Sequence, residues 1–175
     1  MNAKRAQVLW FSGLSGSGKT TLVQALEKEL VQKGFQVKIL DGDDIRKIYH
    51  QRLGFSREDI KKNNHFAVEL CLREQSDFDF VLVSMISPFE DLREYARVKI
   101  GLKCHQIYIK TSLEACMKRD VKGLYKKALR GEIENFIGLD PKAPYEIPKK
   151  PDLILDTESL KIDQCVDQLV SFLKI

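Results

Sequence analysis

Residues 13–20 read Gly-Leu-Ser-Gly-Ser-Gly-Lys-Thr, a spacing suited to holding the phosphates of a nucleoside triphosphate. Glycines let successive backbone N–H groups point at phosphate oxygens, and the N-terminus of a following helix adds its dipole. Lys19 is placed to reach the β- and γ-phosphates, and the Thr20 hydroxyl to ligate a metal. We therefore predict ATP and Mg²⁺ as cofactors. The predicted ATP-binding residues are Gly13, Ser15, Gly16, Ser17, Gly18, Lys19, Thr20 and Thr21.

A second chemical cluster follows the next apolar run, where Asp41, Asp43 and Asp44 lie within four residues. Carboxylates this close repel one another unless a cation or a hydrogen-bond donor is nearby. Asp41 and Asp43 are therefore candidates to hold Mg²⁺ through water, and Asp43 is the candidate general base for an acceptor hydroxyl. Arg46, about one helical turn later, is suited to an acceptor phosphate. The alternative is an Asp-rich turn that caps a helix.

The third motif, Ser84-Met85-Ile86-Ser87-Pro88, follows another apolar run. Many nucleotide-binding proteins with this loop carry an acidic metal-binding residue here, and this chain has none. The outer shell of the metal must then come from Asp41 and Asp43. Ser84 or Ser87 is expected to bond a phosphate or a water. A serine turn that ends a strand is the alternative.

Basic residues cluster at 119–127, which read Arg-Asp-Val-Lys-Gly-Leu-Tyr-Lys-Lys. Arg119 and Lys122 are placed to close over the phosphates, where they would stabilise charge in the transition state and exclude water. A solvated basic run is the alternative interpretation.

These motifs need a scaffold, and apolar runs alternate with amphipathic segments of helical length. That alternation predicts an α/β fold, a three-layer doubly wound parallel sheet of the P-loop kinase type, with the motifs at the carboxyl ends of the strands. Residues 1–175 are expected to form one domain. The weakly periodic residues at about 120–148 are expected to form a lid, or alternatively a poorly ordered insert. We expect strands at 7–12, 36–40, 78–85, 104–109 and 153–155, and helices at 19–33, 43–51, 56–74, 90–99, 113–119 and 162–173.

Composition narrows the class of partner. The formal net charge of +4, with both signs interspersed, suits an enzyme that handles nucleotides and does not indicate nucleic acid. No signal peptide and no apolar run of about 20 residues is present, so no membrane association is expected. The four cysteines form no C-x-x-C pair, and we expect buried, reduced thiols in a cytoplasmic protein.

Taken in order, the motifs resemble the adenylylsulfate (APS) kinase family. The shared text includes GLSGSGKTT at 13–21, LDGD at 40–43, LGFS at 53–56, ISP at 86–88, KGLYKKA at 122–128 and PYE at 144–146. The resemblance implies phosphorylation of the 3′-hydroxyl of APS in sulfate assimilation. Candidate catalytic residues are Lys19, Asp43, Arg119 and Ser87, although a serine matching Ser87 is phosphorylated in some members. Implied substrate-binding residues are Asp41, Arg46, Phe55, Asn63, Ile86, Ser87, Lys122, Leu124 and Phe136, with the two phenylalanines stacking on the base.

The departures from this resemblance gather on the acceptor side. Ile60 stands where the family has an acceptor-binding arginine, and His65 and Phe66 stand where it has two more. A relative that phosphorylates another nucleotide, such as cytidine diphosphoramidate in capsule biosynthesis, is therefore an alternative to APS. A non-catalytic nucleotide sensor is a second alternative. If the chain were another kind of small-metabolite kinase, the ISP and KGLYKKA motifs would have no explanation. Family members are often dimers, so a homodimer is one expected assembly.

Overall fold

The computed structural model describes residues 5–49 and 53–175. Its central sheet has five parallel strands in the order β2-β3-β1-β4-β5. Strands that are covered on both faces need apolar residues throughout, and every residue of β3 is buried. The strands are β1 (Gln7–Ser12), β2 (Val37–Asp41), β3 (Phe80–Ser84), β4 (Cys104–Lys110) and β5 (Leu153–Asp156).

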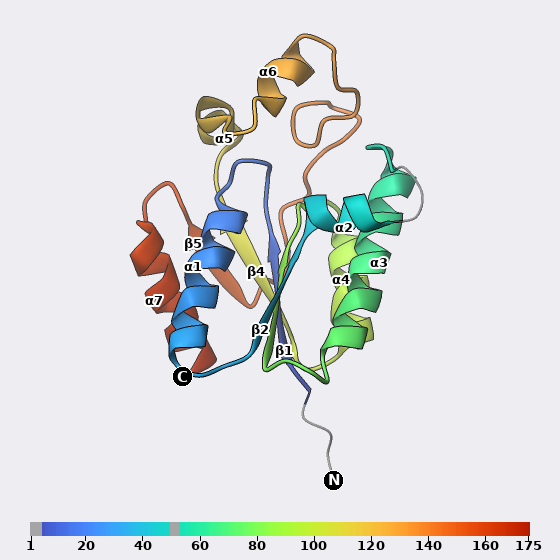
Figure 1. Ribbon diagram of the computed structural model, residues 1–175. Coiled ribbons are helices and arrows are strands. Elements are labelled where there is room, and N and C mark those ends of the chain that lie inside the picture. The colour runs from blue at the N-terminus through green and yellow to red at the C-terminus, as the bar shows by residue number, and fades with distance from the viewer. Residues whose placement is uncertain (1–4, 50–52) are drawn as a thin grey trace.

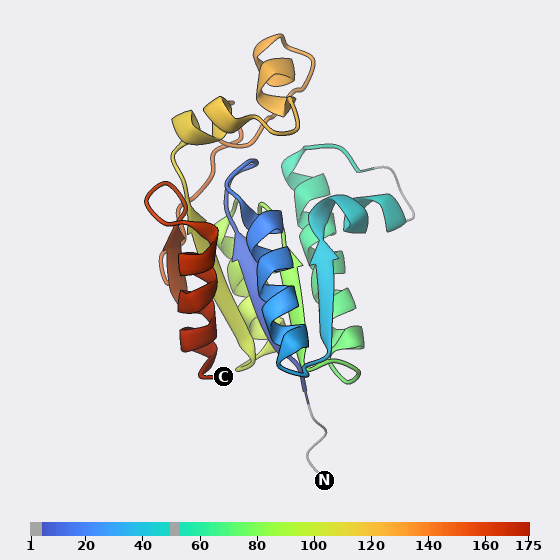
Figure 2. The same ribbon diagram turned by 60° about the vertical axis from the view of Figure 1, so that its left-hand side comes forward.

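Helices cover both faces of this sheet (Figures 1 and 2). On one face, α1 (Lys19–Gln32) and α7 (Ile162–Leu173) bury a core that includes Leu22, Leu26 and Leu169. On the other face, α3 (Arg57–Glu74) and α4 (Glu90–Ile100) bury a core that includes Trp10 and Val68. The predicted three-layer α/β fold is confirmed. Among the described residues, no helix is long and apolar enough to cross a membrane.

Three shorter helices lie at the carboxyl ends of the strands (Figure 1): α2 (Gly42–Ile48), α5 (Leu113–Arg119) and α6 (Leu124–Leu129). The helix α6 was not predicted, because a helix of six residues shows too little periodicity to be detected from the sequence. Contacts outside the helix define its start, since the Asp120 carboxylate accepts hydrogen bonds from the backbone N–H groups of Tyr125 and Lys126. The other predicted helices and strands agree within one or two residues, except that the helix predicted over 43–51 ends at Ile48.

Residues 120–148 rest on a third apolar cluster rather than forming a loose insert. Tyr125, Phe136 and Ile137 from this segment are buried together with Leu14 and Phe89. The segment returns to the sheet immediately before β5 (Figure 1). Residues 50 and 51 of the helix predicted over 43–51, and residues 1–4 of the expected domain, lie outside the described residues.

Candidate functional site

A cavity of about 690 Å³ lies at the carboxyl ends of the strands, between the Gly-rich loop, α2, α3 and residues 119–137. All but one of the residues predicted from the sequence line it. They are Ser15, Gly16, Ser17, Gly18, Lys19, Thr20, Thr21, Asp41, Asp43, Arg46, Phe55, Asn63, Ile86, Ser87, Arg119, Lys122, Leu124 and Phe136. The exception, Gly13, lies behind the loop, where a Cβ atom would come within 2.8 Å of the Ile109 carbonyl oxygen.

The Gly-rich loop connects β1 to α1, and its backbone needs glycine where it turns. Gly16 and Gly18 have φ values of 75° and 102°, which L-residues rarely adopt. Lys19 opens α1 but is only 8% exposed, and its Nζ donates to the carbonyl oxygens of Gly13 at 2.9 Å and Leu14 at 2.7 Å. Burial lowers the pKa of Lys19 to about 8. The ammonium is thus bound by carbonyl oxygens of its own loop.

A group of oxygen atoms suited to Mg²⁺ lies beside this loop. The Thr20 hydroxyl donates to the Asp41 carboxylate at 3.2 Å and lies 3.4 Å from the Ser84 hydroxyl. Mg²⁺ prefers oxygen ligands and is commonly held by one or two carboxylates together with substrate phosphates. No group of three or more His, Cys, Asp or Glu side chains able to hold a metal occurs in the described chain. The residues present therefore fit an ion that a bound nucleotide helps to hold.

The candidate base Asp43 and the cation Lys122 contact each other directly. Lys122 forms an ion pair with Asp43, so residues 120–148 and α2 are linked across the cavity. Arg46, one turn further along α2, lies over the Phe55 ring at 4.8 Å and donates to the Gly54 carbonyl oxygen. Partial burial lowers the pKa of this guanidinium. The cations predicted for the acceptor side therefore lie together, each bound to protein groups.

The Ser87 side chain is buried and hydrogen-bonded to other side chains of the protein. The residue is 1% exposed and adopts a φ of 42°. Its Oγ accepts a hydrogen bond from the Trp10 indole N–H at 2.9 Å and donates to Asn64 Oδ1 at 2.7 Å. Its catalytic role stays a prediction.

Arg119 contacts a part of the cavity that the sequence analysis did not include. Its guanidinium donates to the Thr157 carbonyl oxygen at 2.7 Å, and the Thr157 hydroxyl donates to the Ser17 carbonyl oxygen at 2.8 Å. Leu160 and Ile162 line the same end. The Leu-Asp-Thr run that ends β5 is the signal that could have found this wall. In this conformation Arg119 is bound to Thr157, and its action on the transition state stays a prediction.

The acceptor half combines apolar walls with one orphaned polar atom. Phe136 is 7% exposed, Phe55 is 44% exposed, and both line the cavity. Asn63 also lines it, and its buried Oδ1 has no hydrogen-bond donor among the described residues. A buried acceptor of this kind is normally satisfied by a partner. A ligand with an N–H or O–H group would provide one.

The three departures from the family pattern separate in space. Ile60 is 6% exposed and lines the cavity. The His65 ring instead stacks on Tyr95 at a centroid distance of 3.9 Å, and Phe66 packs edge-on against Tyr49 at 5.1 Å. Neither is among the cavity-lining residues. Of the three, only Ile60 therefore lines the cavity.

A Gly-rich phosphate loop after the first strand, an aspartate-rich second strand end and a basic segment above them together define a P-loop kinase. The chain belongs to the adenylylsulphate kinase family, whose model matches residues 5–156. It is 42% identical to the adenylyl-sulfate kinase of Bacillus velezensis, over 99% of this chain and 87% of that protein.

Solved structures agree with this assignment. The Mycobacterium tuberculosis APS kinase CysC in complex with AMPPNP and APS superposes with a TM-score of 0.90 at 35% identity, over 98% of this chain and 99% of that chain. A gluconokinase from Sinorhizobium meliloti, at 16% identity and a TM-score of 0.59 over 99% of this chain and 94% of that chain, shares the fold alone.

Proposed function

We propose that this enzyme transfers the γ-phosphoryl group of ATP to the 3′-hydroxyl of adenylylsulfate, giving 3′-phosphoadenylylsulfate for sulfate assimilation. The observation that carries the proposal is one continuous cavity, which the Gly-rich loop lines at one end and Phe55, Asn63 and Phe136 line at the other. The similarity to a kinase solved with AMPPNP and APS supports the same pair of ligands.

Each residue has a role that its position supports. The backbone of the Gly-rich loop and Lys19 would bind the phosphates, once Lys19 exchanges the carbonyl oxygens of Gly13 and Leu14 for phosphate oxygens. Thr20 and Asp41 would hold Mg²⁺, which neutralises phosphate charge when bound. Asp43 would accept the proton of the acceptor hydroxyl after Lys122 leaves it for the substrate.

A different nucleotide is the second candidate acceptor, and Ile60 is the observation that favours it. An isoleucine offers no charge-assisted hydrogen bond, which is typically worth about 1.5–3 kcal/mol. Cytidine diphosphoramidate is the example of such an acceptor that the family resemblance suggests. Since His65 and Phe66 do not line the cavity, the case for a changed acceptor depends on this one position.

A coupled ADP-release assay over APS, cytidine diphosphoramidate and simple nucleoside monophosphates tests the proposal. We expect turnover with APS, and the Asp43→Ala variant should lose most of it while still binding ATP. Turnover on the cytidine nucleotide without turnover on APS would replace the first candidate by the second. Undiminished phosphoryl transfer by Asp43→Ala would remove the assignment of the base. ATP binding without turnover on any acceptor would favour a sensor.

Assembly is a separate part of the proposal. We expect a homodimer, and sedimentation at micromolar concentration measures it directly. A monomer at that concentration would leave the proposed reaction untouched.

A further inference from the structure

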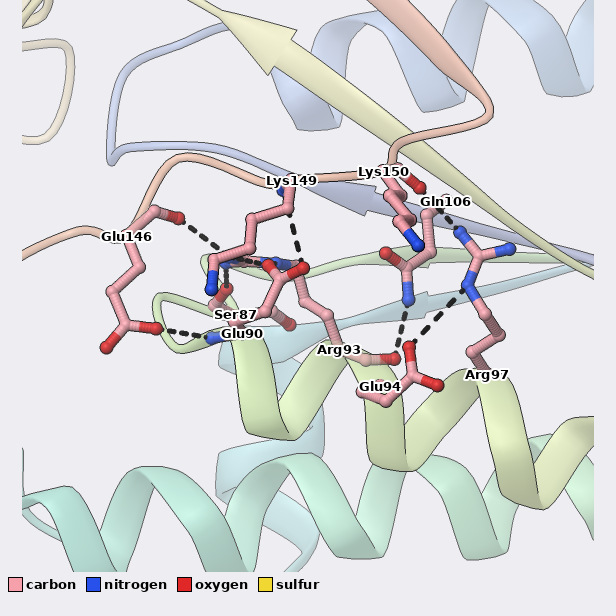
Figure 3. Close-up of polar contacts among 9 residues, drawn as sticks. All are labelled: Ser87, Glu90, Arg93, Glu94, Arg97, Gln106, Glu146, Lys149 and Lys150. Carbon is pink, nitrogen blue, oxygen red and sulfur yellow. Dashed lines mark hydrogen bonds and ion pairs between the residues drawn. The ribbon is translucent and has the colours of Figure 1, made fainter.

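A completely buried arginine contacts the turn that carries Ser87 but does not itself line the cavity. Arg93 of α4 is 0% exposed, and its guanidinium bonds in three directions (Figure 3). It donates to the Ser87 carbonyl oxygen at 2.6 Å, to Glu90 Oε2 at 2.5 Å and to the Glu146 carbonyl oxygen at 2.7 Å. Burying a charge is costly unless it is paired and fully hydrogen-bonded, so this arrangement constrains all of its partners.

One of these partners is the turn that carries Ser87. A φ of 42° is unfavourable for a serine and persists only where surrounding contacts determine it. The hydroxyl of Ser87 is bound by Trp10 and Asn64, and the carbonyl oxygen by Arg93. The Arg93 contact is therefore one of the bonds that fix the backbone of this turn, together with the bond from the Gly13 N–H to the Ile86 carbonyl oxygen at 3.3 Å.

The other partners belong to the chain that returns from residues 120–148. Glu146 is bound to the start of α4 three times: its carbonyl oxygen accepts from Arg93, its carboxylate accepts from the Glu90 backbone N–H at 2.7 Å, and its own N–H donates to the Pro88 carbonyl oxygen at 2.8 Å. The Lys149 N–H adds a contact to Glu90 at 3.3 Å. Arg93 thus joins the Ser87 turn to the end of the lid segment.

Arg97, one helical turn further along α4, is a natural comparison for Arg93. Arg97 binds the same returning segment further along, at the Lys150 carbonyl oxygen at 2.9 Å (Figure 3). It also pairs with the Asp152 carboxylate at 3.0 Å. It has no contact with Ser87 among those recorded for the described residues. Arg97 therefore holds this segment as Arg93 does, but it lacks the contact that Arg93 makes with Ser87.

We propose that Arg93 is a positioning residue for the acceptor: it sets the backbone of Ser87, and hence the hydrogen bonds of Ser87 and Asn64, in the conformation that the acceptor nucleotide meets. The inference deepens the proposed function and depends on it for the identity of the acceptor. Among the described residues, no hydrogen bond joins Arg93 to the Gly-rich loop, which is linked to the Ser87 turn by the bond from the Gly13 N–H to the Ile86 carbonyl oxygen at 3.3 Å. The binding of ATP should therefore depend on Arg93 much less than the binding of the acceptor.

The kinetic test compares Arg93→Lys with the matched variant Arg97→Lys. A lysine keeps the charge beside Glu90 but cannot reproduce the planar fork that reaches three acceptors. We expect Arg93→Lys to raise the KM for APS about tenfold, the typical effect of losing a hydrogen bond to a charged group, with the KM for ATP nearly unchanged. Arg97→Lys should leave both constants nearly unchanged. Equal effects of the two variants, or equal rises in both KM values, would reduce Arg93 to a structural role.

Trp10 supplies a readout that does not depend on turnover. It is the only tryptophan in the sequence, it is fully buried, and its indole N–H is bonded to Ser87. Arg93→Lys should shift its fluorescence emission and near-UV circular dichroism while the far-UV spectrum stays native; Arg97→Lys should not. An unchanged Trp10 spectrum in folded Arg93→Lys contradicts the inference, even if wild-type enzyme fails to phosphorylate APS and the proposed function falls.

A second variant covers the case in which Arg93→Lys does not fold. Glu90→Gln leaves an oxygen for the guanidinium to bond but removes its countercharge. Since charge-assisted hydrogen bonds are roughly twice as strong as neutral ones, we expect a smaller change in the same direction, about a threefold rise in the KM for APS. A native Trp10 spectrum and unchanged KM values in this variant would contradict the inference.

Discussion

At the scale of single residues, an entering nucleotide must displace the hydrogen bonds that the buried Lys19 ammonium makes with its own loop. The contacts of Lys19 with the carbonyl oxygens of Gly13 and Leu14 replace water, but incompletely, because its pKa remains lowered to about 8. Phosphate oxygens carry full negative charge and favour the protonated form more strongly than carbonyl oxygens do. Nucleotide binding should therefore raise this pKa.

This linkage predicts how ATP binding depends on pH. Below pH 8 Lys19 of the free protein is mostly protonated, and above it the group is mostly neutral. Because only the charged form attracts phosphate, affinity for ATP should fall as the pH rises through about 8, and binding near that pH should take up a proton. Calorimetry in buffers of different ionisation enthalpy measures the uptake. Lys19→Arg, which keeps its charge, is the control: an identical pH profile in that variant would contradict the assignment.

The place of Lys19, Thr20, Asp41 and Asp43 in the cavity could be predicted because it follows from local context. A glycine-rich turn between a strand and a helix fixes where such side chains go, whatever the rest of the chain does. Arg93 could not be found in this way. Its partners Ser87 and Glu146 lie 6 and 53 residues away, and the contact with Glu146 exists only because the returning segment docks on α4.

At the scale of elements, α6 connects the two ends of the cavity. Tyr125, 2% exposed, donates its hydroxyl to the Ser15 carbonyl oxygen at 2.8 Å, and its ring packs edge-on against Phe136 at 4.9 Å. One side chain therefore contacts both the phosphate loop and an acceptor-side ring. The short helix that carries it was missed because its start depends on Asp120, not on hydrophobic periodicity.

Removing only the hydroxyl of Tyr125 tests this connection. Tyr125→Phe should keep the packing on Phe136, lower the free energy of unfolding by about 1 kcal/mol, and raise the KM for ATP a few-fold by releasing Ser15. Urea unfolding and steady-state kinetics measure the two effects. Tyr95→Phe is the matched control, since that ring stacks on His65 away from the cavity. Wild-type values for both quantities in Tyr125→Phe would mean that the hydrogen bond has no role.

At the scale of the whole molecule, the two cores on the sheet and the third apolar cluster determine the chemistry of the thiols. Cys71 and Cys104 lie in one core, Cys165 in the other, and Cys116 in the cluster under residues 120–148. All four are free and buried. Burial raises the pKa of each, that of Cys104 to about 12.

The raised pKa values predict inert thiols in the native protein. The thiolate is the reactive form, and a raised pKa reduces its population at neutral pH. Ellman's reagent should therefore react far more slowly with native protein than with protein unfolded in guanidinium, where all four groups should titrate. A thiol that reacts in native protein at the rate of free cysteine would contradict this prediction and identify an opening of the core around it.

The fold class could be predicted at this scale, but the order of the strands could not. Strand-helix alternation requires parallel strands with crossover helices, which places every predicted motif at one edge of the sheet. Which strands become neighbours depends on packing between distant segments. The pairing of β1 with β3 and β4 is an example, and it is what brings Trp10 to Ser87.

The same topology also determines on which side of the sheet β1 begins and α7 ends. β1 begins and α7 ends at the end of the sheet opposite α2, α5 and α6 (Figure 1), and the residues that line the cavity lie at the other end. An affinity tag, a fluorescent domain or a surface tether joined near either of these points would leave from the side opposite the nucleotide. Immobilised enzyme should therefore keep an open route to both substrates, whichever of the two points carries the linker.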